Sequence, residues 1–71
     1  MEAILKFNLP EEEIEHLRCV KSSNMYLALW DLDKYLREQI KHQDKHELQV
    51  VRDKLSEIMS DNGISFDELA V

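Results

Sequence analysis

The sequence predicts a mostly α fold, a three-helix domain preceded by a short N-terminal strand. Over three long stretches apolar residues recur at intervals of three and four, which is the period of amphipathic helices. In residues 2–8 apolar and polar residues alternate instead. The sequence has one Gly and one Pro, so few positions would break a helix. We expect a single domain over residues 1–71, because a chain of this length holds one core at most.

The predicted strand covers residues 2–8, where Ala3, Leu5 and Phe7 fall on one face with one apolar exception on the other. A lone strand leaves its backbone N–H and C=O groups without partners. We expect it to pair either with the C-terminal tail or with a second subunit. The tail could instead form one helical turn capped by Ser65.

The first helix is expected from Pro10 to about Lys21. Proline suits a first helical turn, where its missing N–H would have had no acceptor in the helix. The acidic run 11–13 places negative charge at the positive end of the helix dipole. The polar residues 22–24 then supply a turn and an N-cap for the next helix.

The second helix is expected over residues 24–41, and its first turns are apolar on nearly every side. The stripe that we interpret as core consists of Met25, Leu29, Leu32, Leu36 and Ile40. A flank of Tyr26, Trp30 and Tyr35 extends the apolar surface round the helix. Aromatic rings with a polar edge are typical anchors at interfaces, so part of this flank is expected to remain available for another chain.

The third helix is expected to begin after Asp44, which stands three residues before Glu47 in the pattern of a capping box. Gly63 ends it, because glycine adopts the left-handed conformation that follows many helices. Ile64 is then expected to pack back near Met59.

Composition excludes several classes of function. The net charge of −6 disfavours general binding to nucleic acid, although residues 34–54 hold six basic side chains against four acidic ones. No apolar run is long enough to span a membrane, and the N-terminus does not resemble a secretory signal. With one cysteine, Cys19, and no possible internal disulfide, we expect a cytoplasmic protein.

The polar clusters do not indicate an enzyme, a metal or a cofactor. His42 and His46 are four apart, but the expected helix break falls between them and no further ligand is near in sequence. His16 and Cys19 could touch, yet nothing outlines the oxyanion site that a catalytic pair needs.

Charged side chains on the second helix are open to two interpretations. Asp33 is expected to pair with Arg37 at i+4, and Lys34 with Glu38, as ordinary helix ion pairs. Alternatively, basic side chains in this region could contact an anionic ligand or partner. The candidate interaction residues are Tyr26, Trp30, Tyr35, Arg37, Lys41 and Arg52.

Three stretches of the chain resemble a family of short, uncharacterised bacteriophage-encoded proteins. These are the run Lys6-Phe7-Asn8-Leu9-Pro10-Glu11-Glu12, then Tyr26 with Ala28-Leu29-Trp30-Asp31-Leu32-Asp33-Lys34-Tyr35-Leu36-Arg37, and Val51-Arg52-Asp53-Lys54-Leu55. The resemblance covers most of the chain and implies expression in the cytoplasm of an infected bacterium. It implies no enzymatic activity.

Two functions remain open from the sequence. The first is a non-catalytic interaction protein, an oligomer that binds and modulates a host protein. We expect an oligomer because so short a chain without disulfides or metals rarely has enough core to fold alone. The alternative is a protein that sequesters a nucleotide-like defence signal in pockets between subunits, with aromatic rings stacked on the base and arginines on phosphate.

Overall fold

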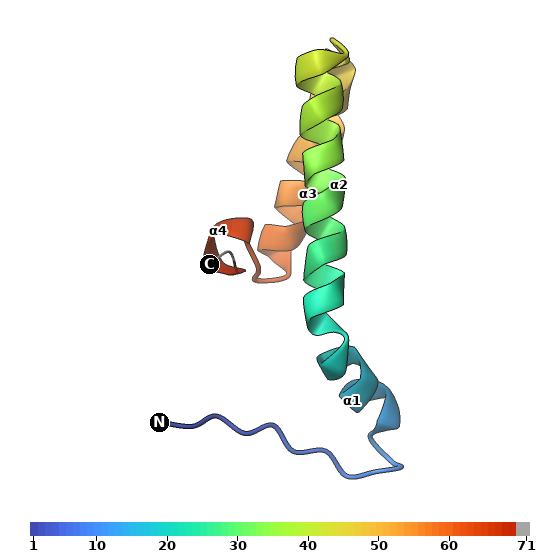
Figure 1. The fold of residues 1–71 in the computed structure, drawn as a ribbon, viewed down its shortest axis with the longest axis vertical. Coiled ribbons are helices and arrows are strands. Elements are labelled where there is room, and N and C mark those ends of the chain that lie inside the picture. Colours follow the sequence, from blue (N-terminus) through green and yellow to red (C-terminus); the bar gives the residue numbers. More distant parts are fainter. Residues whose placement is uncertain (70–71) are drawn as a thin grey trace.

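The structure is a computed structural model that describes residues 1–69. Its elements are α1 (Glu13–Val20), α2 (Ser22–His42), the 3-10 turn η1 (His46–Leu48), α3 (Gln49–Asp61) and α4 (Phe66–Leu69) (Figure 1). The mostly helical class is therefore as predicted, and the three main helices form close to the predicted positions. The first begins at Glu13 and not at Pro10, because residues 9–12 form a turn. A fourth, short helix forms in the tail.

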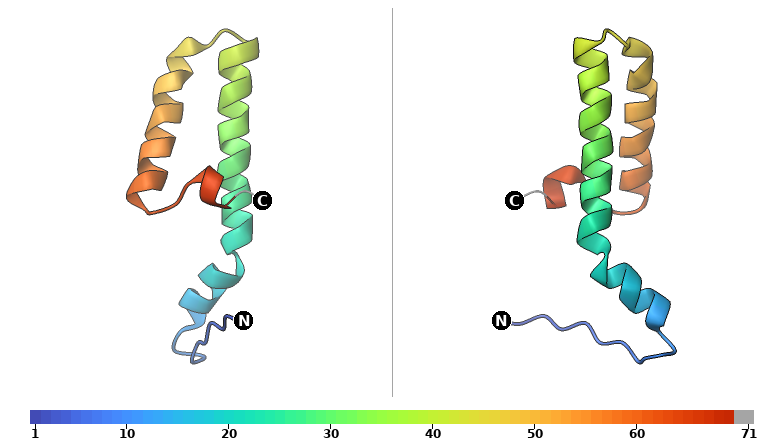
Figure 2. Two further views of the ribbon diagram at one scale, coloured as in Figure 1. Left: turned by 90° about the vertical axis from the view of Figure 1, so that its left-hand side faces the viewer. Right: turned by 45° about the vertical axis from the view of Figure 1, so that its right-hand side comes forward.

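The centre of the fold is an antiparallel hairpin of α2 and α3 (Figure 2). Asp44 lies in the connection with a φ of 55°, a left-handed conformation that Asp tolerates better than most residues. The predicted capping box is wrong, because Asp44 turns the chain and no side chain caps η1 or α3. Regular α-helix consequently begins only at Gln49, four residues later than expected.

The hairpin buries very few side chains. Leu36 of α2 and Met59 of α3 are each 4% exposed and are the buried apolar residues of the described chain. Leu29, Ile40 and Leu55 are half-buried around them. The predicted core stripe is only partly right, because Met25 and Leu32 remain exposed.

A bend at Lys21 separates α1 from α2, and α1 turns away from the hairpin (Figures 1 and 2). The Ser22 hydroxyl donates a hydrogen bond of 2.7 Å to the carbonyl of Cys19, within the turn that joins the two helices. A serine that bonds back to the preceding turn often bends a helix. Residues 22–24 thus form the first turn of α2 and do not cap it, contrary to expectation.

The predicted N-terminal strand is not formed, and residues 1–69 contain no strand. The first residues run as an extended segment below α1 (Figure 1). The tail that could have paired with this segment forms α4 instead, so the segment has no strand beside it in the chain. The expected pairing with a second subunit stays a prediction.

The end of α3 follows the sequence prediction closely. Gly63 has a φ of 73°, its N–H donates to the carbonyl of Ser60, and the N–H of Ile64 donates to the carbonyl of Met59. These two bonds define a Schellman cap. The Ser65 hydroxyl then accepts a bond of 3.1 Å from the Glu68 N–H, which caps α4 as the sequence indicated.

The described chain is elongated. Its Cα radius of gyration is 16.1 Å, whereas a compact domain of this length has about 11 Å. No helix within residues 1–69 is long and apolar enough to cross a bilayer.

We predict that Gly63→Ala destabilises the fold by about 1 kcal/mol, because an alanine pays a steric penalty in the left-handed region. No atom lies within 4 Å of an added Cβ, so the penalty is conformational and not a clash. Urea unfolding followed by circular dichroism at a fixed protein concentration measures the change. Gly63→Asn is the matched control and should lose less, since Asn tolerates this conformation. Equal losses for Ala and Asn would contradict the explanation.

Candidate interaction site

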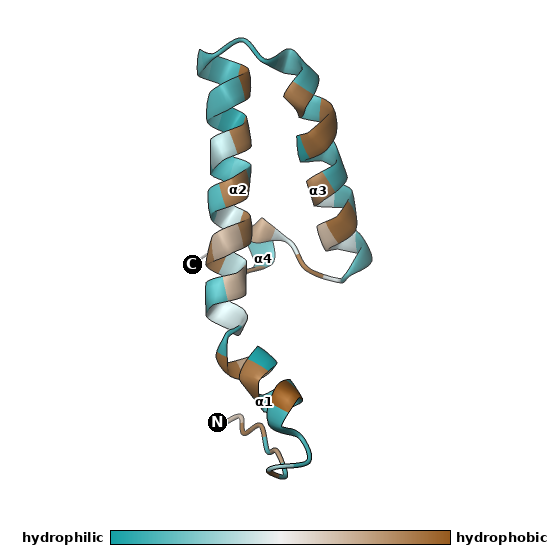
Figure 3. Cartoon of the chain, turned by 90° about the vertical axis from the view of Figure 1, so that its right-hand side faces the viewer, coloured by the Kyte–Doolittle hydropathy of each residue, from teal (hydrophilic) through white to brown (hydrophobic). Residues whose placement is uncertain are grey.

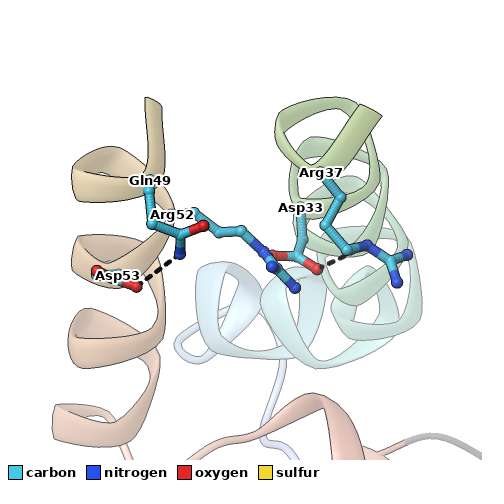
Figure 4. A network of polar contacts seen from close by, with 5 residues as sticks. All are labelled: Asp33, Arg37, Gln49, Arg52 and Asp53. Atoms are coloured by element: carbon cyan, nitrogen blue, oxygen red, sulfur yellow. Dashed lines mark hydrogen bonds and ion pairs between the residues drawn. The ribbon is translucent and has the colours of Figure 1, made fainter. Parts of the chain in front are cut away.

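The structure places one carboxylate between two arginines at the centre of the hairpin (Figure 4). Asp33 of α2 is 7% exposed. Its Oδ1 accepts a hydrogen bond of 2.9 Å from Nε of Arg52 on α3, and its Oδ2 lies 3.6 Å from Nε of Arg37 one turn along α2. The predicted Asp33–Arg37 pair is thus confirmed. The ion pair from Asp33 to Arg52 joins the two helices and was not anticipated.

A signal for that second ion pair was present in the sequence. On α2, Asp33 stands three residues before Leu36 and four after Leu29, so it interrupts the face that meets α3. Arg52 of α3 likewise stands three residues before Leu55 and four after Leu48 of η1. Opposite charges placed singly within two apolar faces indicate that the faces meet at those positions.

Two of the predicted aromatic residues form a cluster with a residue of α4. Trp30 and Phe66 pack edge to face, with ring centroids 5.4 Å apart at 86°. The ring centroid of Tyr26 lies 6.3 Å from that of Trp30 and 6.2 Å from that of Phe66. The guanidinium of Arg37 sits 5.9 Å from the centroid of Trp30, within cation–π range. Tyr26 and Trp30 are half-buried, so the tail occupies much of the aromatic surface that was expected to be free.

The six predicted interaction residues lie in four places, of which the first two are linked by the contact of Arg37 with the Trp30 ring. Tyr26 and Trp30 contact α4, Arg37 and Arg52 converge on Asp33, and Tyr35 lies on a different side of α2 with 55% exposure. Lys41 lines a shallow hollow near the end of α2, which is also lined by Lys34, Arg37, Glu38 and His42. The structure therefore does not bring the aromatic rings and the basic groups into one pocket.

No group of three metal-ligating side chains comes together within residues 1–69. His42 ends α2 while His46 lies in η1, so the two do not share a helix, as predicted. His16 packs against Phe7 with ring centroids 5.4 Å apart. Cys19 is half-buried.

Two uncovered apolar surfaces lie on the helices of the described residues. The first lies on the α2–α3 hairpin, and we call it the open face; its residues are each 45–55% exposed and are Leu32, Tyr35, Val51 and Ile58. The second is the outer stripe of α1, formed by Ile14, Leu17 and Val20. Apolar side chains gathered on one surface of a soluble protein indicate a place where another molecule binds.

Comparisons with protein-family models, with curated proteins and with solved structures find no match to this chain. The resemblance to bacteriophage proteins therefore stays a prediction.

We predict that Asp33→Asn lowers the free energy of unfolding by about 1–3 kcal/mol, because the charge-assisted bond from Arg52 is lost and that guanidinium keeps no anionic partner. Asp53→Asn is the matched control. Asp53 accepts a 2.8 Å bond from Gln49 within α3, and it is exposed. Its replacement should change stability by less than about 0.5 kcal/mol. Equal losses measured by urea unfolding would mean that the Asp33–Arg52 contact does not stabilise the hairpin.

We also predict that Phe66→Ala shifts the fluorescence of Trp30 to longer wavelength, because removing the ring opens the indole to water. Trp30 is the single tryptophan, so the emission reports this site alone. Phe7→Ala removes the other phenylalanine of the chain, which packs on His16 of α1, and should leave the emission unchanged. An unchanged spectrum for Phe66→Ala would show that α4 is not held on α2.

Proposed function

We propose that this chain is a non-catalytic interaction protein that works as an oligomer and binds another protein. If the resemblance to bacteriophage proteins is right, that target belongs to the bacterial host. The acidic net charge of −6 would favour a basic surface on the target.

The observation that carries the proposal is the amount of surface that the single chain leaves in water. The accessible surface of the 8.4 kDa chain is 6271 Å². A folded monomer of this mass exposes about 4,600 Å². The difference of about 1,700 Å² is larger than the roughly 800 Å² that each partner contributes to a standard interface.

The kind of surface supports the same proposal. Fifteen large apolar side chains of the described chain are exposed, against two that are buried. Dispersed apolar residues are normal on a protein surface. Here, however, several of them gather on the open face and on the α1 stripe, and a chain with so small a core gains most of its apolar burial from association.

The alternative, sequestration of a nucleotide-like signal, has weaker support. The arginines that would contact phosphate already face the carboxylate of Asp33, and the indole that would stack on a base contacts Phe66. Binding would have to displace these contacts.

Sedimentation equilibrium of the purified chain at micromolar concentration tests the proposal. We expect a mass that is a multiple of 8.4 kDa and that falls on dilution. A folded monomer over the whole concentration range would contradict it. A thermal-shift panel of nucleotides tests the alternative, which predicts a large stabilisation by one of them; the proposal predicts none.

A further inference from the structure

The two sides of the hairpin are not equivalent. On one side α4 packs on Tyr26 and Trp30 of α2, and the segment that carries it lines a hollow together with Ser56 and Ser60 of α3. The other side has no element of the described chain upon it (Figure 3). This is the side of the open face.

Helix geometry places the open-face residues of both helices on that uncovered side. At 100° per residue, Leu32 lies about 160° round α2 from Trp30. On α3, Ile58 lies about 160° from both Ser56 and Ser60. Each residue therefore points away from the α4 side of its own helix. Leu32 and Ile58, with their neighbours Tyr35 and Val51, form one surface across the two helices.

We propose that a second copy of this chain packs on the open face, so that two hairpins form a four-helix bundle with a two-fold axis along the helices. This inference rests on the proposed function and names the surface and the partner of its self-association. In this arrangement α2 of one chain lies on α3 of the other, and every helix has antiparallel neighbours. Such packing is the usual geometry of four-helix bundles.

The amount of surface that the chain leaves in water favours a second copy as the partner. The surface in excess of a compact monomer, to which the extended N-terminal segment and α1 also contribute, exceeds one side of a standard interface. This excess is present in every molecule of the chain. A copy of the same chain is available wherever the chain is made. It also supplies a matching apolar face of two helices, as a two-fold interface requires.

The charges at the two edges of the open face fit this arrangement. Asp31 flanks Tyr35 on the α2 edge, and Lys54 flanks Val51 and Ile58 on the α3 edge, where it pairs with the exposed Glu57. The contact of Asp33 with Arg52 places these two residues at the same height along the hairpin. Because α2 and α3 are antiparallel, Asp31, two residues before Asp33, lies at the height of Lys54, two residues after Arg52. The two-fold axis would therefore place Asp31 of each chain beside Lys54 of its partner.

A matched pair of substitutions tests the inference by sedimentation. Ile58→Lys puts a charge into the open face, and Ile14→Lys puts the same charge into the outer stripe of α1, where the isoleucine is similarly exposed. At a micromolar concentration where the wild type is a dimer, we expect Ile58→Lys to sediment as one chain of 8.4 kDa and Ile14→Lys to remain dimeric.

A photo-crosslink keeps the test independent of whether Ile58→Lys folds. Tyr35→p-benzoylphenylalanine places the photoreactive group on the open face, and Leu27→p-benzoylphenylalanine places it on the side of α2 opposite Leu36, where Leu27 is 53% exposed. Irradiation should give a covalent dimer from position 35 and not from position 27.

The possible outcomes separate the inference from the proposed function. A wild-type oligomer that survives Ile58→Lys, or that crosslinks from position 27 and not from position 35, overturns the inference and leaves the proposed function standing. A mass above two chains for the wild type also overturns the closed bundle. A folded wild-type monomer overturns both.

Discussion

The ion pair between Asp33 and Arg52 fixes the arrangement on which the rest of this fold depends. Moving a charge out of water costs free energy unless a partner receives it. The hairpin buries one carboxylate and only two apolar side chains. Other registers of α2 against α3 would leave the buried carboxylate without Arg52, and so small a core offers little apolar burial to offset that loss. The register that brings Arg52 to Asp33 decides which residues of α2 and α3 meet. It also decides which remain for α4 on one side and for the open face on the other.

The helices and the cap at Gly63 could be predicted because each depends on residues close in sequence. The strand at residues 2–8 could not be settled in the same way. Alternating apolar residues show that a segment could pair with the edge of a sheet, but a strand forms only where another strand is present to pair with it. The tail that could have been that strand forms α4 instead. Asp44 shows a similar limit, because a residue that suits a helix cap also tolerates the left-handed turn that it adopts here.

The candidate site was predictable in composition but not in geometry. Periodicity shows that α2 is apolar over a wide arc, yet it does not say which neighbour covers each part. Phe66 packs on Tyr26 and Trp30, two of the three residues of the aromatic flank. Tyr35, five residues after Trp30, points about 140° away and stays exposed. Leu32, assigned to the core, belongs with Tyr35 on the surface that remains. Assigning these residues required the partner elements to be known.

The bend at Lys21 has a consequence for the valency of the protein. It directs α1 away from the hairpin, so the stripe of Ile14, Leu17 and Val20 projects beyond the end of the proposed bundle. A two-fold axis along the helices would present both copies of α1 at the same end. A target with two equivalent sites would then be held twice, with the second contact made at the high effective concentration that a rigid link provides. Dissociating the bundle would remove this avidity without altering either α1 stripe.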